Sequence, residues 1–231
     1  SLKGSVGFVP TMGYLHAGHV ALVHEARKEN STVVASIFVN PTQFGPNEDL
    51  ESYPRDLEAD KAALKKAGTD YVYYPSVEDI YPPKFDTYIE VGTVTETLEG
   101  AKRPTHFRGV ATVVTKLFNI VQPQRAYFGQ KDGQQVIVIK KMVADLNIPI
   151  EIITVPTVRE SDGLALSSRN SYLNKHERNA ATILYQSLTE AQSLYRNGQR
   201  NAEKLREAMR NILITEPLAN IEYISVADTD T

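Results

Sequence analysis

The chain has 231 residues, of which 42% are hydrophobic and 23% charged, and a formal net charge of −3 at pH 7. This composition is typical of a folded protein with one large or two modest domains, and it excludes the disordered class. No stretch approaches the roughly 20 apolar residues of a membrane span and no signal-peptide pattern opens the chain, so we expect a cytoplasmic protein with no membrane partner. The absence of cysteine excludes disulfides and thiolate zinc sites, and the acidic balance argues against a nucleic-acid partner.

The stretch from Val6 to Asn30 predicts a strand, a loop and a helix. Val6–Val9 has the β-branched and aromatic content of a buried strand, and apolar residues recur at helical spacing from Val20. The connecting loop contains Gly13, His16, Gly18 and His19. A loop that runs from a parallel strand into a helix ends among unpaired backbone N–H groups, which favour phosphate, and both imidazoles can donate to the same anion. Taken alone, a histidine at a helix start usually has an ordinary polar role.

The rest of the chain predicts alternating strands and helices. Strands are expected at residues 32–39, 71–74, 125–128 and 150–155, and helices at residues 56–67, 110–121 and 134–145. Residues 88–91 are expected to be extended, and residues 99–109 to form a polar, basic loop. This order predicts an α/β fold over residues 1–157, a Rossmann-like parallel sheet with flanking helices. Amphipathic helices at 175–198 and 201–214 and a strand at 221–226 predict a smaller C-terminal α+β domain over residues 158–231.

Further candidates lie where the strands end, because open α/β sheets bind ligands at the carboxyl ends of their strands. Gln43 follows the second strand and offers a donor and an acceptor to a hydroxyl or a carboxylate. Lys131 follows the fourth strand and can hold a phosphate as a point charge. Asp60 lies one helical turn after Asp56 and could approach a metal, although without further context such a pair usually belongs to a solvated helix face.

Two signatures and five longer segments resemble a known family. The H-x-G-H string at residues 16–19, preceded by Thr11-Met12-Gly13, resembles the signature of the nucleotidyltransferase superfamily, which includes class I aminoacyl-tRNA synthetases and small adenylyltransferases. The residues 166–169, Leu-Ser-Ser-Arg, resemble its second signature, a loop that closes over the triphosphate. The segments FVPTMGYLHAGH, FVNPTQFGPNEDLESYPRD, EGAKRPTHFRGVATVV, YFGQKDGQQ and LALSSRNSYL, in that order, resemble the pantothenate synthetase family over nearly the whole chain.

The family resemblance implies an ATP-dependent ligation with Mg²⁺. The carboxylate of pantoate attacks the α-phosphate of ATP and releases pyrophosphate, and the amine of β-alanine then attacks the pantoyl adenylate to give pantothenate and AMP. The resemblance also implies a homodimer, and further residues before the first strand and after Thr231. We expect residues 167–169 to form a lid that ATP orders, in a loop with little to pack against.

The resemblance assigns roles to individual residues. ATP binding is assigned to Met12, Gly13, Tyr14, Leu15, His16, Ala17, Gly18, His19, Gly129, Gln130, Lys131, Asp132, Val158, Leu166, Ser167, Ser168 and Arg169. Catalytic roles are assigned to His16, His19, Lys131, Ser167, Ser168 and Arg169, with His19 as a proton donor. Pantoate binding is assigned to Gln43 and Gln135, with Asn40 and Arg103 as further candidates and Asp60 as a neighbour of Mg²⁺. Two alternatives stay open, namely another small adenylyltransferase with H-x-G-H and a nucleotide-binding module without catalysis.

Overall fold

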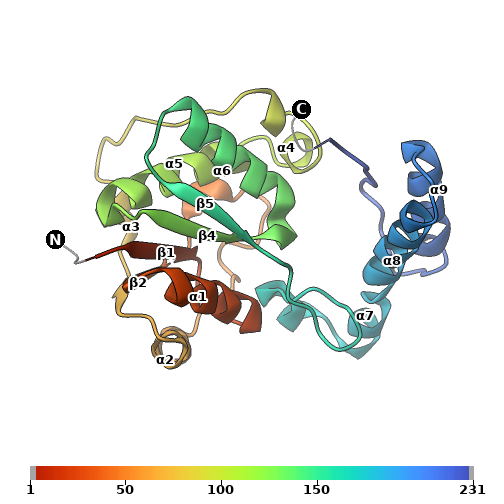
Figure 1. The fold of residues 1–231 in the computed structure, drawn as a ribbon, viewed down its shortest axis with the longest axis horizontal. Coiled ribbons are helices and arrows are strands. Elements are labelled where there is room, and N and C mark those ends of the chain that lie inside the picture. Colours follow the sequence, from red (N-terminus) through yellow and green to blue (C-terminus); the bar gives the residue numbers. More distant parts are fainter. Residues whose placement is uncertain (1–3, 229–231) are drawn as a thin grey trace. The chain divides into compact units, whose positions relative to one another are not determined.

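A parallel sheet organises the first part of the chain. The structure, a computed structural model, describes residues 4–228, and the chain divides into two compact units, Ser1–Thr157 and Val158–Thr231. The first unit contains a five-stranded parallel sheet in the order β3-β2-β1-β4-β5 (Figure 1). Its strands are β1 (Val6–Thr11), β2 (Thr32–Ile37), β3 (Tyr71–Tyr73), β4 (Arg125–Gly129) and β5 (Glu151–Val155). The predicted α/β fold with a parallel sheet is confirmed.

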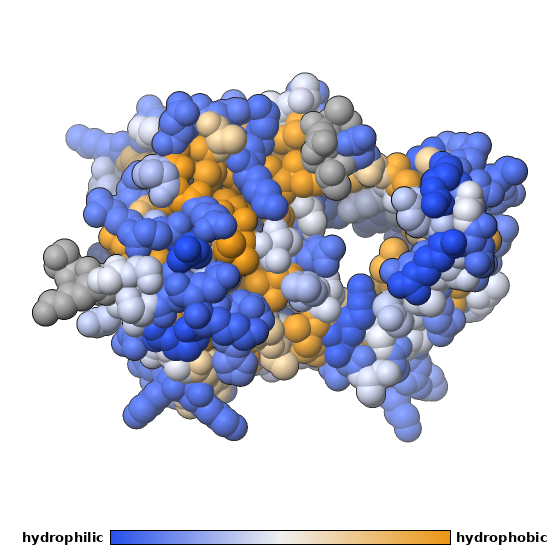
Figure 2. All heavy atoms as spheres, in the orientation of Figure 1, coloured by the Kyte–Doolittle hydropathy of each residue, from blue (hydrophilic) through white to orange (hydrophobic). Residues whose placement is uncertain are grey.

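The central strands alternate their side chains between two layers of helices. Phe8 and Phe128 belong to a core cluster with α5 (His106–Val121) and α6 (Gly133–Asp145). Val9 and Tyr127, their chain neighbours, belong to a second cluster with α1 (Ala17–Glu29) and α2 (Leu57–Ala67) on the other face. Hydrophilic residues cover the outward side of α1 (Figure 2). Burial of both sheet faces explains why the strands are continuous apolar runs in the sequence.

The parallel register brings three loops to one edge of the sheet. Thr11 pairs with Ile37 at the carboxyl ends of β1 and β2, and β4 pairs with β1 on its other side. The strands β1, β2 and β4 lead respectively into α1, into the 3₁₀ helix η1 (Pro41–Gln43) and into the 3₁₀ helix η3 (Gln130–Asp132). Apart from Asp60 in α2 and Arg103 after α4 (Glu99–Lys102), the residues predicted to bind ligand in the first unit therefore follow adjacent strands.

Two stretches of the first unit differ from the prediction. Residues 99–109, expected to form a loop, contain the helix α4 (Glu99–Lys102) and the first turn of α5. Gly109 packs so closely on the backbone of Thr42 that a Cβ would collide with it, and this tertiary contact supports a helical turn that the sequence disfavours. Residues 88–91 form no strand, because the Ile89 amide donates to the Thr112 hydroxyl (2.9 Å) instead of to a neighbouring strand. The short helices α3 (Val77–Ile80) and η2 (Thr93–Thr95) complete this unit.

The described part of the second unit is helical. It contains η4 (Ser168–Tyr172), α7 (Lys175–Ala180), α8 (Ile183–Arg196) and α9 (Ala202–Leu213). The helix expected at 175–198 is interrupted at Ala181 and Thr182, where hydrogen bonds of the i to i+3 type tighten the turn.

The strand expected at residues 221–226 does not form, so that part of the prediction is wrong. A strand needs a ladder partner. The described residues of the second unit provide only an isolated antiparallel bridge between Arg159 and Ala165. Between residues 4 and 228, every helix is too short or too polar to cross a membrane.

Candidate active site

The loop after β1 takes its shape from two consecutive residues with positive φ, Gly13 (+86°) and Tyr14 (+51°). A Cβ on Gly13 would lie 2.9 Å from Oδ2 of Asp60 and 3.1 Å from Cγ2 of Ile37, so only glycine fits here. Asp60, which is 3% exposed, accepts hydrogen bonds from the backbone N–H of Tyr14 at Oδ2 (2.8 Å) and of Leu15 at Oδ1 (2.7 Å). The carboxylate on α2 therefore anchors the loop that carries the predicted ATP-binding residues.

Two histidines cap the helix that follows this loop. His16 is the N-cap of α1, and its Nδ1 accepts from the Gly18 amide (3.1 Å), while Nδ1 of His19 accepts from the His16 amide (3.2 Å). The two ring centroids lie 4.1 Å apart. Because each Nδ1 accepts a hydrogen bond, this network assigns the proton of each neutral ring to Nε2.

Both rings are neutral at pH 7. Burial and the positive charge of Lys131 lower the pKa of His16 to about 4, against an opposing effect of Asp132. Burial and the charges of His16 and Lys131 lower the pKa of His19 to about 3. The histidines therefore present Nε2–H groups as hydrogen-bond donors and carry no charge, which differs from the role of proton donor assigned to His19 by resemblance.

Most backbone amides of this loop already have partners. The amides of Gly13, Tyr14, Leu15, His16 and Gly18 donate to side chains, and that of His19 donates to the His16 carbonyl. The expectation that unpaired N–H groups at this helix start would hold an anion is wrong for these residues, because the histidine capping box, Asp60 and the Thr11 hydroxyl satisfy them. The imidazole Nε2–H groups are the donors that the loop offers instead.

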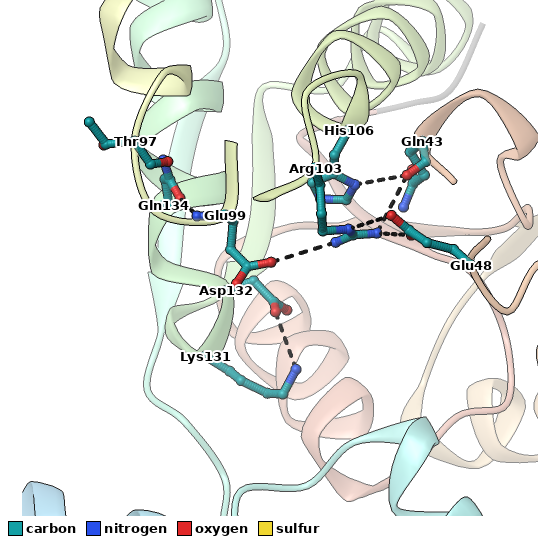
Figure 3. Close-up of polar contacts among 9 residues, drawn as sticks. All are labelled: Gln43, Glu48, Thr97, Glu99, Arg103, His106, Lys131, Asp132 and Gln134. Atoms are coloured by element: carbon teal, nitrogen blue, oxygen red, sulfur yellow. Dashed lines mark hydrogen bonds and ion pairs between the residues drawn. The ribbon is translucent and has the colours of Figure 1, made fainter. Parts of the chain in front are cut away.

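Lys131 supplies positive charge from the adjacent strand connection. It lies in η3, directly after β4, with Nζ 3.2 Å from Oδ1 of Asp132 and a side chain that is 38% exposed (Figure 3). Its charge lowers the pKa of both His16 and His19. The loops after β1 and β4 thus form one electrostatic environment, as their common sheet edge predicts.

Asn40 and Gln43 form a buried amide pair after β2. The Asn40 side chain, 1% exposed, donates from Nδ2 to Oε1 of Gln43 (3.1 Å) and to the Gly109 carbonyl (3.1 Å), and its Oδ1 accepts from the Tyr81 hydroxyl (2.8 Å). Nε2 of Gln43 then lies 3.1 Å from Sδ of Met12. Asn40 therefore fixes the amide of Gln43 with its NH₂ group beside the loop after β1, where it can donate to a carboxylate.

Arg103 is held between two acidic side chains (Figure 3). Its Nε and Nη2 lie 2.9 and 2.5 Å from the carboxylate oxygens of Glu48, and Nη1 lies 3.9 Å from Glu99. The hydrogen bonds from Arg103 hold the pKa of Glu48 below its ordinary value. Nδ1 of His106, whose pKa is lowered by burial, lies 2.9 Å from the Gln43 carbonyl. This cluster braces the loop after β2 against α4 and α5.

Sequence reasoning identified Arg103 but missed Glu48 and His106. Glu48 is 55 residues from Arg103, and His106 is 63 residues from Gln43. No local spacing connects such pairs, and the only signal was their place inside the segments that carry the family resemblance.

The two glutamines in the first turn of α6 have different surroundings. Gln134 donates to the carbonyls of Val94 (3.0 Å) and Thr97 (2.8 Å) and accepts from the Glu99 amide (3.0 Å), so it ties α6 to the segment between η2 and α4 (Figure 3). Gln135, to which pantoate binding is assigned by resemblance, is partly buried. The structure thus gives Gln134 a structural role and leaves the assignment of Gln135 as a prediction.

The remaining predicted ATP-binding residues lie in the second unit. They are Val158, Leu166, Ser167, Ser168 and Arg169. The loop folds back on itself, with the Leu166 amide bonded to the Val158 carbonyl (3.0 Å), and Leu164 is only 6% exposed. Ser167 caps η4 by accepting from the Arg169 amide (3.3 Å). The expectation that this loop has little to pack against is therefore wrong.

The metal assignment is not tested by these contacts. Among residues 4–228, no group of three or more His, Cys, Asp or Glu side chains could hold a metal ion. Mg²⁺ in nucleotide sites is usually held by one or two carboxylates together with the phosphates and water, so magnesium that arrives with ATP needs no such group. The place of Asp60 near Mg²⁺ stays a prediction.

Comparison with known proteins identifies the family. The family described as pantoate-beta-alanine ligase matches residues 1–231. The chain belongs to the pantoate–β-alanine ligase family. A pantothenate synthetase of Herpetosiphon aurantiacus is 61% identical over 223 residues, which are 96% of this chain and 81% of that protein.

Solved structures of this ligase family have the same fold. The crystal structure of pantothenate synthetase from Thermus thermophilus is 52% identical, with a TM-score of 0.96 over 98% of this chain and 82% of that one. The pantoate–β-alanine ligase of Francisella tularensis, crystallised with β-γ ATP and β-alanine, is 41% identical, with a TM-score of 0.79 over 91% of this chain and 78% of that one. The resemblance found in the sequence is confirmed at the level of the ligase family.

Proposed function

We propose that the chain joins pantoate to β-alanine through a pantoyl adenylate, with cleavage of ATP to AMP and pyrophosphate. The observation that carries this proposal is the fixed NH₂ group of Gln43, which lies beside Met12 in the loop that presents His16 and His19. A carboxylate bound by Gln43 would lie next to a nucleotide bound by that loop. This arrangement suits a reaction between a carboxylate and a phosphate better than the transfer of AMP to a phosphate ester.

In the first step, a carboxylate oxygen of pantoate forms a bond to the α-phosphorus of ATP, and the bond from that phosphorus to pyrophosphate breaks. The Nε2–H groups of His16 and His19 and the ammonium of Lys131 donate to phosphate oxygens on which negative charge grows. In the second step, the β-alanine nitrogen attacks the acyl carbon, the bond to the AMP oxygen breaks, and the amine loses a proton. No side-chain nucleophile is needed, because the mixed anhydride is already activated.

The two units take different parts in this proposal. Residues 1–157 form the nucleotide-binding domain, with Gln43 and Gln135 at pantoate and Asn40 and Arg103 beside it. Residues 158–231 form the C-terminal domain, whose Ser167, Ser168 and Arg169 close over the triphosphate and exclude water from the adenylate. ATP enters as its Mg²⁺ complex. The homodimer rests on the family resemblance alone, and the cytoplasmic location stays a prediction from the sequence.

An exchange assay tests the reaction and separates the alternatives. We expect pantoate-dependent exchange of labelled pyrophosphate into ATP without β-alanine, and pantothenate plus AMP when β-alanine is added. Exchange that does not depend on pantoate would indicate a different adenylyltransferase. ATP binding without exchange or product would indicate a nucleotide-binding module.

Lys131 offers a residue-level test with a matched control. Lys131→Ala is expected to slow adenylate formation roughly 10²- to 10³-fold, the usual loss for one donor aimed at developing charge. Its melting temperature should stay native, because within residues 4–228 the lysine side chain pairs only with its neighbour Asp132. Lys140→Ala, at an exposed position of the same strand–helix unit, should retain full activity. Near-normal turnover of Lys131→Ala would remove this residue from the mechanism.

A further inference from the structure

Asp60 is an acidic residue with a buried side chain. It lies in the first turn of α2 and is 3% exposed. Each of its two oxygens accepts one backbone hydrogen bond from the loop after β1, from Tyr14 and from Leu15. Hydrogen bonds from backbone amides are what stabilise a carboxylate away from water. The carboxylate therefore belongs structurally to that loop, although it lies more than forty residues later in the chain.

The loop needs such an anchor. Tyr14 has φ of +51°, a left-handed conformation that is costly for a residue with a Cβ and persists only where its surroundings enforce it. The preceding Gly13 turns the chain toward α2, with room for no side chain against Asp60. Together these residues aim two successive amides at the carboxylate.

The anchored turn ends at the histidine pair. Leu15 directly precedes His16, which caps α1 and whose amide donates to Nδ1 of His19. A shift of the Tyr14–Leu15 peptide would therefore move the His16 backbone and the ring that depends on it. The position of both Nε2–H groups is set by a chain of bonds that begins at Asp60.

We propose that Asp60 is a positioning residue, which holds the turn at Tyr14 and Leu15 so that His16 and His19 present their Nε2–H groups to ATP. Asp60 itself touches neither substrate nor metal in this role. The inference rests on the proposed function only in that ATP is the ligand of this loop.

Asp60→Asn is the sharpest variant. It keeps the size of the side chain and one acceptor oxygen, but its NH₂ group faces a backbone N–H, so one of the two bonds becomes a clash of donors. Asp60→Ser is the second variant, in case the amide prevents folding. Asp56→Ala is the matched control, because the exposed Asp56 also accepts a backbone amide of α2, that of Ala59 (3.0 Å), without contact to the loop.

The measurements are MgATP affinity by calorimetry, kcat and KM for each substrate, and the melting temperature. We expect Asp60→Asn to weaken MgATP binding and to lower kcat/KM for ATP roughly 10²-fold, the scale of a small misplacement of reacting groups, with KM for pantoate unchanged. Asp56→Ala should lower the melting temperature and keep wild-type MgATP affinity.

Three outcomes would overturn the proposal. The first is unchanged ATP affinity and kcat in a folded Asp60 variant. The second is an equal loss of affinity for ATP and for pantoate. The third is recovery of activity in excess Mg²⁺, which would make Asp60 a metal ligand. If the wild-type protein binds MgATP but makes no pantothenate, the proposed ligase reaction fails, while the MgATP titrations still decide the role of Asp60.

Discussion

Acidification tests whether the two histidines act as neutral donors. With a pKa of about 4, roughly 1% of His16 is protonated at pH 6, whereas an ordinary histidine with a pKa of 6.5 is roughly three-quarters protonated. His19, with a pKa of about 3, is protonated still less. We therefore expect kcat/KM for ATP to show no change between about pH 5.5 and pH 7.5 that depends on these residues.

The assay is the pH profile of adenylate formation for wild type, His19→Gln and His19→Ala. Glutamine at this position of a capping box can accept from the N-cap amide and still offer a neutral N–H donor. His19→Gln should therefore keep far more activity than His19→Ala. If His19 is instead a proton donor in the reaction, both variants lose activity equally and the wild-type rate falls above pH 6.5, which would refute the neutral-donor reasoning.

The same pKa shifts fix the pH dependence of stability. Protonation of His16 and His19 is easier in the unfolded chain, where the pKa is near 6.5, than in the folded protein. Their contribution to stability is therefore fully present above pH 6.5 and is lost as the pH falls toward the folded-state values. Unfolding experiments on wild type and His19→Gln should differ most in this acidic range.

Two further predictions concern the neighbouring clusters. Gln43→Ala should weaken pantoate binding more than ATP binding and should also lower the melting temperature, because Gln43 is buried. Gln135→Ala, at a less buried position, should weaken pantoate binding without a loss of stability. If titrations show equal weakening of pantoate and ATP binding, the glutamines serve the fold instead. Arg103→Ala and Glu48→Gln should each lower the free energy of unfolding, measured in urea, by about 1–3 kcal/mol. The double variant should lose less than the sum of the two single losses, and strict additivity would contradict a direct interaction between the two side chains. Because the pKa of Glu48 lies below its ordinary 4.5, its contribution should vanish as the pH falls below that value.

The sheet and its helices could be predicted from local pattern. The strands β1, β2, β4 and β5 are short apolar runs that can be recognised from local hydrophobicity. Helix α2 ends at Gly68, which has the positive φ expected of a residue that ends a helix. Where the prediction failed, tertiary contacts decided the structure. The start of α5 depends on Gly109 against the η1 loop, and residues 221–226 have no strand partner within the described chain.

Most residues of the candidate site could be predicted from the sequence, but the contacts between them could not. The H-x-G-H spacing identified His16 and His19, yet their mutual capping follows from ring orientation, which a sequence does not record. Asp60 was expected to neighbour Mg²⁺ because it lies one helical turn after Asp56 and because the family resemblance assigns it that place. Its burial and its bonds to Tyr14 and Leu15 depend on how α2 packs against the loop after β1.

The distribution of charge over the site follows from burial. A buried imidazolium would lose its hydration and would be repelled by Lys131, and both effects lower the histidine pKa values. A neutral N–H donor loses less on burial, and its bond to a phosphate oxygen strengthens as charge develops there. The ammonium of Lys131, whose side chain is 38% exposed, is accessible to water. In the proposed reaction, the site would attract a polyanion through Lys131 and still release pyrophosphate and AMP, because the two rings would add directional bonds without adding net positive charge.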